Sequence, residues 1–488
     1  MGRLDLGVGL ALMPGLVDDL DRVADLVDCL EVEPQTFWWE TGDPAAPFRV
    51  DRDEVVGLAR RFDAVLLHGV SSPIGGSRPP RPSMVELFAT TARLVGARLA
   101  SEHLAFNEAP HGLGPSGDAP GAETFSTAFF LPPRQTPAGV EAAVEAVARF
   151  RSALAVPFSV ETPVSYLRRR DDEMDDGSFV AAVAERADCG ILLDLHNIWA
   201  NQRNGRQDAR DYVDQLPLDR VWEVHLAGGL ERNGFWLDAH SGGLHPDLLA
   251  LAADVLPRLP ALRAVVYEIL PEFVRQDGRD VLRPDLETVQ RLVAATGVGR
   301  SRRTPTPRPR PSSDRSAPPA PSADQLRDPA VWEHALATLS IGRSASVGDP
   351  LGVELADDPG IDLLRELVAA GRNGRVASSL PLTIQLLIGL LGVDGVDAVL
   401  VEYAAATEPA QWGSEEGRRF ASWADVRFVD QPAVLAALRL DIAGLDRVRS
   451  QHPVTVALEF EPLALIAAIH GREPLDAVPT GRYVATVG

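Results

Sequence analysis

Short apolar runs alternate with amphipathic stretches through residues 1–299 of the chain. Eight runs of four to seven residues have the length and composition of buried strands: 4–10, 29–33, 64–68, 98–104, 158–161, 191–195, 221–226 and 264–269. Between them, residues 83–94, 137–154 and 177–187 carry apolar side chains at helical spacing. Repeated strand and helix predict an α/β fold with a parallel sheet.

The number of strand–helix units predicts how the sheet closes. Eight units within about 300 residues favour a closed (β/α)8 TIM barrel over an open doubly wound sheet. No G-x-G-x-x-G motif follows the first run, so the sequence does not support a dinucleotide site of the Rossmann type.

A change of composition divides the chain. Residues 300–323 are almost entirely Pro, Ser, Arg, Thr and Ala, which cannot bury a core, so we expect an extended, disordered linker there. The linker separates a barrel domain, 1–299, from a smaller domain, 324–488. In the latter, residues 380–391 and 430–445 predict helices and 454–461 a strand, which indicates an α+β domain.

Composition excludes several classes of function. The 69 acidic and 47 basic residues give a net charge of -22, which argues against nucleic acid or an anionic membrane as partner. No apolar run reaches the length of a transmembrane helix, so we expect a cytoplasmic protein. The chain has no lysine, which excludes Schiff-base and P-loop chemistry. Its two cysteines, Cys29 and Cys189, lie in apolar runs and are expected to be inert core residues.

The predicted strands end in histidines and carboxylates. In a barrel these ends converge on the face where catalytic groups sit. A buried cluster of such groups costs several kcal/mol per group unless it is paired or binds a metal. With the Asp-x-His pair after the seventh strand, the candidate ligands are His68, His103, Glu161, Asp194, His225, Asp238, His240 and Glu268. His196 and His111 are further histidines expected near this face.

The ligand set indicates more than one metal ion. A single zinc needs three or four ligands, so eight mixed nitrogen and oxygen ligands predict two or three metals. Imidazole and carboxylate suit iron, manganese or zinc, and these residues do not choose among them. Because their strands are neighbours, we expect Glu161 and Asp194 to bridge or share metals.

Seven motifs, in order, resemble the multinuclear non-haem iron-dependent oxidative enzymes. They are LEVEP at 30–34, HGVSSPIGG at 68–76, SEHLAF at 101–106, VETPVSYL at 160–167, LLDLHNIW at 192–199, PLDRVWEVHLAGG at 217–229 and WLDAH at 236–240. The resemblance covers roughly residues 5–275.

The resemblance implies an activity. Members of that family are TIM barrels that hold two or three irons, in mixed Fe(II)/Fe(III) states, and use O2 as co-substrate. They modify residues, most often Cys, of ribosomally made precursor peptides. Matched by motif, the eight ligands above are metal ligands, His196 and Asn197 are candidates for a third metal, and Glu161, Asp194 and His225 are the catalytic residues.

Three positions depart from the family pattern. Gln35, Thr36 and Phe37 follow Pro34 where the family usually has Glu-Asn-Tyr, and Thr162 replaces an Asn. Gly229 stands where a His commonly follows Leu-Ala-Gly. No proposed ligand is lost, so the resemblance predicts an intact metal centre and an altered peptide groove.

The C-terminal segment carries a second resemblance. Residues 418–428 and 433–448 are similar to the partner proteins that help such enzymes to bind their peptide. The resemblance implies that the partner is fused to its enzyme as a peptide-recognition domain with an exposed strand. Whether the chain forms a homo-oligomer stays open.

Two other classes of function remain as alternatives. The first is a zinc or manganese TIM-barrel hydrolase or sugar isomerase, because such barrels use similar ligands. The second is a non-catalytic, metal-dependent peptide-binding protein. The identity of the metal and the reaction with O2 separate these alternatives from the iron enzyme.

Overall fold

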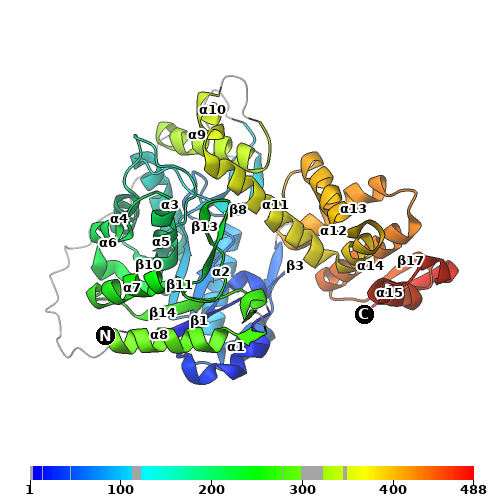
Figure 1. Cartoon of the computed structure of the whole chain (residues 1–488), viewed down its shortest axis with the longest axis horizontal. Coiled ribbons are helices and arrows are strands. Elements are labelled where there is room, and N and C mark those ends of the chain that lie inside the picture. The colour runs from blue at the N-terminus through cyan, green and yellow to red at the C-terminus, as the bar shows by residue number, and fades with distance from the viewer. Residues whose placement is uncertain are drawn as a thin grey trace.

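A computed structural model describes residues 4–13, 15–43, 46–112, 123–276, 278–297, 323–344 and 349–488 (Figure 1). The eight predicted runs all form parallel strands: β1 (Gly7–Leu12), β2 (Cys29–Val32), β5 (Ala64–Gly69), β6 (Leu99–His103), β9 (Phe158–Glu161), β10 (Gly190–Asp194), β11 (Val221–Ala227) and β14 (Ala264–Glu268). They close into a barrel in the order β1-β14-β11-β10-β9-β6-β5-β2. The predicted TIM barrel is therefore confirmed.

Helices surround the barrel. They are α1 (Arg52–Ala59), α2 (Pro82–Val95), α3 (Pro137–Ala153), α4 (Asp176–Arg186), α5 (Leu195–Arg203), α6 (Ala209–Gln215), α7 (Pro246–Val255) and α8 (Leu282–Thr296). Helices α1 to α7 lie between barrel strands in the sequence, and α8 follows the last one. The three predicted helices correspond to α2, α3 and α4. Cys29 and Cys189 are buried free thiols, as expected of core residues, and burial raises the pKa of each.

Four antiparallel hairpins follow barrel strands and were not predicted. They are β3 (Trp38–Glu40) with β4 (Phe48–Val50), β7 (Phe106–Pro110) with β8 (Thr124–Leu131), β12 (Gly229–Arg232) with β13 (Phe235–Asp238), and β15 (Arg275–Gln276) with β16 (Arg279–Asp280). Each hairpin comes after the carboxyl end of a barrel strand. The hairpins therefore extend the face on which the predicted ligands lie.

The C-terminal region is mostly helical and contains one two-stranded sheet within the described residues. Its elements are α9 (Ala323–Ser340), α10 (Pro350–Ala356), α11 (Pro359–Ser379), α12 (Pro381–Ala406), α13 (Gly413–Arg427), α14 (Pro432–Ser450), β17 (Val454–Phe460), α15 (Pro462–Gly471) and β18 (Thr480–Val487). All but the last residue of the predicted linker, 300–323, lies outside the described residues. The domain limits stay a prediction.

Two apolar cores hold this region together. Helices α9 to α11 pack on the hairpins of the barrel, where Leu336 and Ile361 share a core with Phe106 and Leu237. The indole of Trp332 also donates a hydrogen bond of 2.9 Å to the carbonyl of Pro132. A separate core joins α12 to α15 with the β17–β18 sheet. Figure 1 shows this second part beside the barrel, with β3 and α11 nearest to it.

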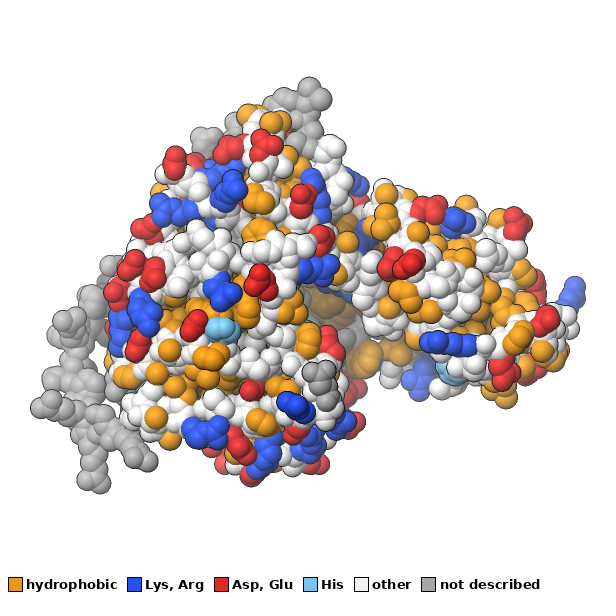
Figure 2. Space-filling model, in the orientation of Figure 1, with side chains coloured by type: hydrophobic (Ala, Val, Ile, Leu, Met, Phe, Trp, Pro, Cys, Tyr) orange, Lys and Arg blue, Asp and Glu red, His pale blue; other side chains and the backbone are white. Residues whose placement is uncertain are grey.

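Helix α12 is, among the described residues, the one that is long and apolar enough to cross a membrane. Gly392 interrupts it with φ 71° and ψ 173°, which divides it into two shorter segments. The first segment is fixed inside the fold, because Asp441 accepts hydrogen bonds from the backbone of Leu382 and Thr383. Around the break, Leu390 and Val393 are exposed, and Figure 2 shows apolar side chains scattered over this part of the surface.

Candidate metal centre

Three adjacent strands bring the first group of predicted ligands together. His68, His103 and Glu161 come from β5, β6 and β9, which are neighbours in the barrel. The Nε2 atoms of His68 and His103 lie 3.3 Å and 3.1 Å from Oε2 of Glu161. One ligand atom from each residue fits within 4.8 Å of the other two, as a metal site requires.

Glu161 also belongs to a second group, with Asp194 and His225, whose ligand atoms again lie within 4.8 Å of one another. Asp194 ends β10 and is the N-cap of α5, because its Oδ1 accepts a 2.8 Å hydrogen bond from the backbone of Asn197. Its other oxygen, Oδ2, is buried without a partner. The carboxylate of Glu161 thus lies between two groups of potential ligands.

The remaining predicted ligands come from the ends of β13 and β14. Nε2 of His240 lies 3.2 Å from Asp238 and 3.5 Å from Glu268, and Nδ1 of His225 lies 3.2 Å from Glu268. His240 adopts φ 44°, a left-handed conformation that costs of order 1–3 kcal/mol for a non-glycine residue. Its carbonyl accepts a 2.8 Å hydrogen bond from Leu270, which holds the turn in place.

Hydrogen bonds on the outer ring nitrogens orient three of the imidazoles. Nδ1 of His103 lies 2.8 Å from the carbonyl of Gly69, which only accepts, so this nitrogen carries the proton. Nδ1 of His68 lies 2.8 Å from Oγ of Ser101, and Nε2 of His225 lies 3.1 Å from Glu31. These contacts leave the inner nitrogens free to bind a cation, the usual arrangement around metal-bound histidines.

Sequence reasoning missed four carboxylates beside the predicted ligands. Glu31 and Glu223 are both buried next to His225, and together they form a third group with metal-ligand spacing. Glu102 accepts a hydrogen bond from the backbone of Ser72, and Glu33 follows β2. The signal was available in the alternation of strands, because Glu223 and His225 are two residues apart and share a face.

Opposite charges fix the protonation of His103 and Glu268. Burial disfavours the protonated form of His103, but the carboxylates of Glu161 and Glu102 outweigh it and raise its pKa to about 9. Burial also disfavours the carboxylate of Glu268, yet the neighbouring imidazoles, first among them His225, lower its pKa to about 2. The group therefore contains ion pairs whose protons a metal cation would replace.

Two other carboxyls have a raised pKa. Burial, reinforced by the carboxylates of Asp238 and Glu268, raises the pKa of Asp194 well above its usual range. Burial also raises the pKa of Glu33 to about 7, with the imidazole of His68 opposing the shift. Glu33 is thus a carboxyl that can exchange a proton near neutral pH.

Several buried polar atoms of the cluster lack a hydrogen bond, which favours a metal site over a purely structural cluster. Nearly all buried polar side-chain atoms in proteins have a hydrogen-bond partner. Here Oδ2 of Asp194 has no hydrogen bond, and Oε2 of Glu161, Nδ1 of His225, Oδ1 of Asp238 and Oε2 of Glu268 have ion-pair contacts at 3.1–3.5 Å but no hydrogen bond. Carboxylate and imidazole donors without thiolates suit iron, manganese or zinc, so the residues present fit the predicted kind of metal.

The other predicted residues lie at different distances from the centre. Nδ1 of His196 lies 3.3 Å from Asp238, and the buried amide oxygen of Asn197 has no partner. His111 does not join the group, because its Nε2 lies 3.5 Å from Glu408 of the C-terminal region.

One edge of the centre is open. The side chains of His103, Asp238 and His240 are 23%, 19% and 23% exposed, whereas His225 is fully buried and Glu161 is 5% exposed. Phe130 of β8 covers this edge in part, with its ring 4.2 Å from that of His103. A substrate would therefore reach the centre beside β8.

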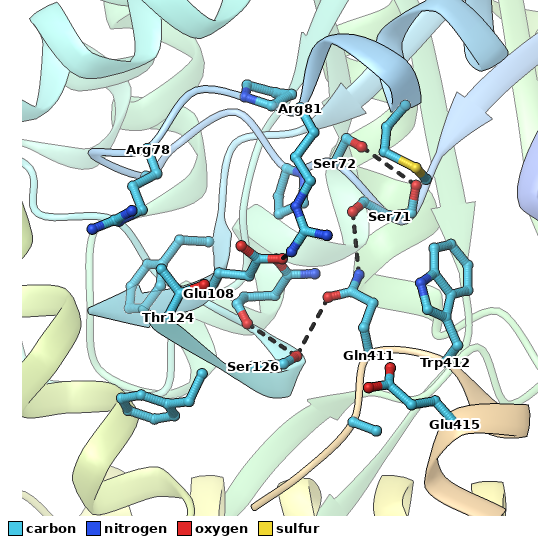
Figure 3. Close-up of a pocket in the computed structure, with 18 of the residues that line it drawn as sticks. Ser71, Ser72, Arg78, Arg81, Glu108, Thr124, Ser126, Gln411, Trp412 and Glu415 are labelled. Carbon is cyan, nitrogen blue, oxygen red and sulfur yellow. Dashed lines mark hydrogen bonds and ion pairs between the residues drawn. The ribbon is translucent and has the colours of Figure 1, made fainter. Parts of the chain in front are cut away.

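A cavity of about 410 Å³ lies between the barrel and the C-terminal region. Its walls are the loop before α2, the hairpin β7–β8 and residues 408–419. Figure 3 shows Gln411 between Ser126 and Ser71, to which it is joined by hydrogen bonds of 3.3 Å and 3.2 Å, and Trp412 along the wall. The cavity therefore exists only because the two parts of the chain meet.

Comparison with known proteins gives a family match. Residues 7–270 match the model of the family described as RiPP precursor modification enzyme MbnB/TglH/ChrH, where RiPP denotes a ribosomally made and modified peptide. The chain is 28% identical over 254 residues to a UPF0276 protein of Streptomyces avermitilis, covering 52% of this chain and 49% of that protein. It is also 28% identical to a UPF0276 protein of Chromobacterium violaceum, covering 52% of this chain and 87% of that protein.

Solved structures with a similar barrel are more distant. An L-ribulose 3-epimerase matches with 15% identity and a TM-score of 0.37, covering 62% of this chain and 100% of that chain. An endonuclease IV from Thermus thermophilus matches with 16% identity and a TM-score of 0.34, covering 58% of this chain and 98% of that chain. Scores this low carry no argument about activity.

Substitution of Glu161, the carboxylate that both ligand groups share, should remove metal from both groups. We expect Glu161→Gln to lose metal from both positions, and Asp194→Asn from one only, because Asn keeps the N-cap of α5 while it removes the charge. Metal per chain is measured by elemental analysis, with folding checked by circular dichroism. Glu108→Gln, which changes a half-buried carboxyl that is paired with Arg81 outside the ligand groups, is the control and should bind as much metal as the natural chain. Full metal content in Glu161→Gln would contradict this assignment.

Metal binding should strengthen as the pH rises toward 9. His103 has a pKa of about 9 in the folded chain, above the usual 6.5, so below pH 9 a metal must displace its proton. We expect calorimetry in buffers of different ionisation enthalpy to report at least about one proton released per metal bound at pH 7. The raised pKa of His103 also contributes to the free energy of unfolding of the metal-free chain. This contribution is complete below pH 6.5 and is lost as the pH rises through 9. Metal binding without proton release would contradict the raised pKa of His103, because it would show that no proton is displaced from the ring.

Proposed function

The chain belongs to the MbnB/TglH/ChrH family of RiPP precursor modification enzymes, and from this premise we propose that it is an iron-dependent enzyme that consumes O2. Its substrate would be a residue, most often a cysteine in enzymes of this kind, of a ribosomally made precursor peptide. The ligands would be the eight predicted residues, with Glu161, Asp194 and His225 at the reacting position.

The position of Glu161 between two ligand groups is the observation that carries the proposal. Glu161 would be able to help hold a cation in each group, and Asp194 on the neighbouring strand would help to hold the second. Bound iron supplies the one-electron redox chemistry that activation of O2 requires.

The residues of the chain orient the imidazole rings of the centre and shield the centre from bulk water. Ser101, Gly69 and Glu31 fix the rings of His68, His103 and His225 so that their inner nitrogens face the centre. The buried side of the group keeps bulk water away, and the open edge beside His103 admits a side chain. A cysteine thiol that binds there would have to lose its proton, and Glu33, whose pKa burial raises to about 7 in the metal-free chain, would be a carboxyl suited to accept it.

The cavity between the two parts of the chain supports a role for the C-terminal region in peptide binding. Its wall includes the aromatic rings of Phe48 and Trp412, whose centroids are 4.7 Å apart, and the polar face of β8 at Ser126. Strand β8 continues from there to Phe130 beside His103. A peptide lying in the cavity would therefore have a path along β8 to the open edge of the centre.

The sheet β17–β18 supplies a second contact for such a peptide. It has only two strands, and the side chains of β18 alternate between exposed and half-buried. An extended segment can pair with the free edge of a sheet through backbone hydrogen bonds. This supports the proposal that the C-terminal region is the fused partner, and the covalent connection would raise the effective concentration of the bound peptide.

Oxygen consumption tests the activity. The protein is purified without air, its metals are counted, and O2 uptake is followed with a cysteine-containing precursor peptide encoded next to its gene. We expect iron in the protein, O2 uptake only when peptide is present, and a changed peptide mass. Zinc or manganese as the sole metal would support a hydrolase or isomerase. Iron without peptide-dependent O2 uptake would favour a peptide-binding protein.

Trp412 tests the role of the cavity. Removal of its ring in Trp412→Ala should raise the KM for the peptide by about ten-fold or more, because a buried aromatic contact contributes about 1.4 kcal/mol or more to binding. The metal content and the kcat at saturating peptide should not change. Val401→Ala, an exposed position in the same region outside the cavity, is the control and should leave KM as it is. An unchanged KM in Trp412→Ala would exclude the cavity from peptide binding.

A further inference from the structure

His196 differs from the other histidines of the centre in the partner on its outer nitrogen. The Nε2 atom of His196 accepts a hydrogen bond of 3.0 Å from the indole Nε1 of Trp236. In His103, by contrast, the outer nitrogen donates to a carbonyl, and in His225 it faces a carboxylate. An indole N–H can only donate, so Nε2 of His196 must offer its lone pair.

This contact decides where the proton of His196 lies. A neutral imidazole has one N–H and one lone pair, so a lone pair used on Nε2 leaves the proton on Nδ1. Nδ1 lies 3.3 Å from Oδ1 of Asp238, which also lies 3.2 Å from His240; the first contact has the distance of an ion pair without the alignment of a hydrogen bond. With a proton on Nδ1 and a donor on Nε2, the ring has no nitrogen left to bind a metal.

We propose that Trp236 and His196 form a positioning pair that holds the carboxylate of Asp238 toward the metal centre, and that His196 is not itself a metal ligand. The sequence had suggested His196 as a ligand of a third metal. The geometry assigns it to the layer behind the ligands, where it acts through Asp238. The inference rests on the proposed metal centre but needs neither iron nor O2.

The pair is held by several contacts around Trp236. Asn204 bonds both backbone groups of Trp236, at 2.7 Å and 3.0 Å, and the guanidinium of Arg203 lies 4.5 Å above its ring. His196 is completely buried on α5. The bonds of Asn204 fix the backbone of Trp236, and the contact with Arg203 and the burial of His196 favour the observed positions of the two rings.

Gly229 makes the contact of the two rings sterically feasible. A Cβ atom at position 229 would overlap both Nε1 of Trp236 and Nε2 of His196. Any other residue there would therefore separate the two rings. Gly229, which stands where a His commonly follows Leu-Ala-Gly, therefore leaves the adjacent space to the indole of Trp236.

The test compares the same substitution at two histidines in the zinc-loaded protein. Gln has an oxygen that can accept from Trp236 and an amide N–H that can donate to Asp238, but it is a poor substitute for an imidazole ligand. We expect His196→Gln to keep the full number of zinc ions with an affinity lowered about ten-fold, the scale of a contact behind the ligands. His225→Gln should lose zinc outright. Equal loss of zinc in the two variants would overturn the inference.

A second readout reports the proton directly. NMR spectra of zinc-loaded protein labelled with ¹⁵N-histidine identify the His196 signal as the one that is absent from His196→Gln. This signal should show a protonated Nδ1. It should shift in Trp236→Phe and in Gly229→Ala. An Nδ1 of His196 that is unprotonated and shifted by zinc would contradict the inference. This result is read in the natural chain, so it does not depend on how well a variant folds. If His225→Gln binds as much zinc as the natural chain, the metal centre itself fails and this inference falls with it.

Discussion

The carboxylate of Glu161, buried among imidazoles at the end of β9, is the constraint on which the site depends. His68 and His103 face one of its oxygens, and Asp194 and His225 lie close on the other side. So many ionisable groups in a low-dielectric site are unstable unless each charge has a partner. The protons on the imidazoles give one solution and a pair of divalent cations gives another. Metal binding and protonation therefore compete for the same atoms, which couples the function of the site to pH.

The barrel provides this arrangement because its strands run parallel and end on one face. Six of the eight barrel strands end in one predicted ligand each, and the β12–β13 hairpin and the turn after it supply Asp238 and His240. The β12–β13 hairpin carries both Asp238 and Trp236, so a single element would provide a predicted ligand and, through His196, the group proposed to orient it. The C-terminal region packs on the hairpins β7–β8 and β12–β13 through α9 and α11, and the segment at Gln411 contacts the loop at Ser71. The surroundings of the site therefore come from both parts of the chain.

The sequence predicted the barrel, and it predicted which histidines and carboxylates cluster at the mouth, because both depend on local patterns. Apolar runs mark the strands, and a His or carboxylate at the end of a run falls on the mouth whatever the loops do. Glu31 and Glu223 were missed because they lie beneath the mouth, where their role comes from contact with His225. The bond from Trp236 to His196 could not be predicted, because it depends on the fold of a hairpin and on the space left by Gly229. The packing of α9 to α11 on the barrel likewise follows from long-range contacts that have no periodic signal.

The most direct test of the central claim is anomalous diffraction from crystals of the protein purified with its own metal. Data collected on either side of the iron absorption edge locate iron without reference to any assumed ligand. The account predicts two iron positions that share Glu161, one beside His68 and His103 and the other beside Asp194 and His225, with Nδ1 of His196 outside the bonding distance of both. A single metal that does not contact Glu161, or two metals without an iron edge signal, would contradict it.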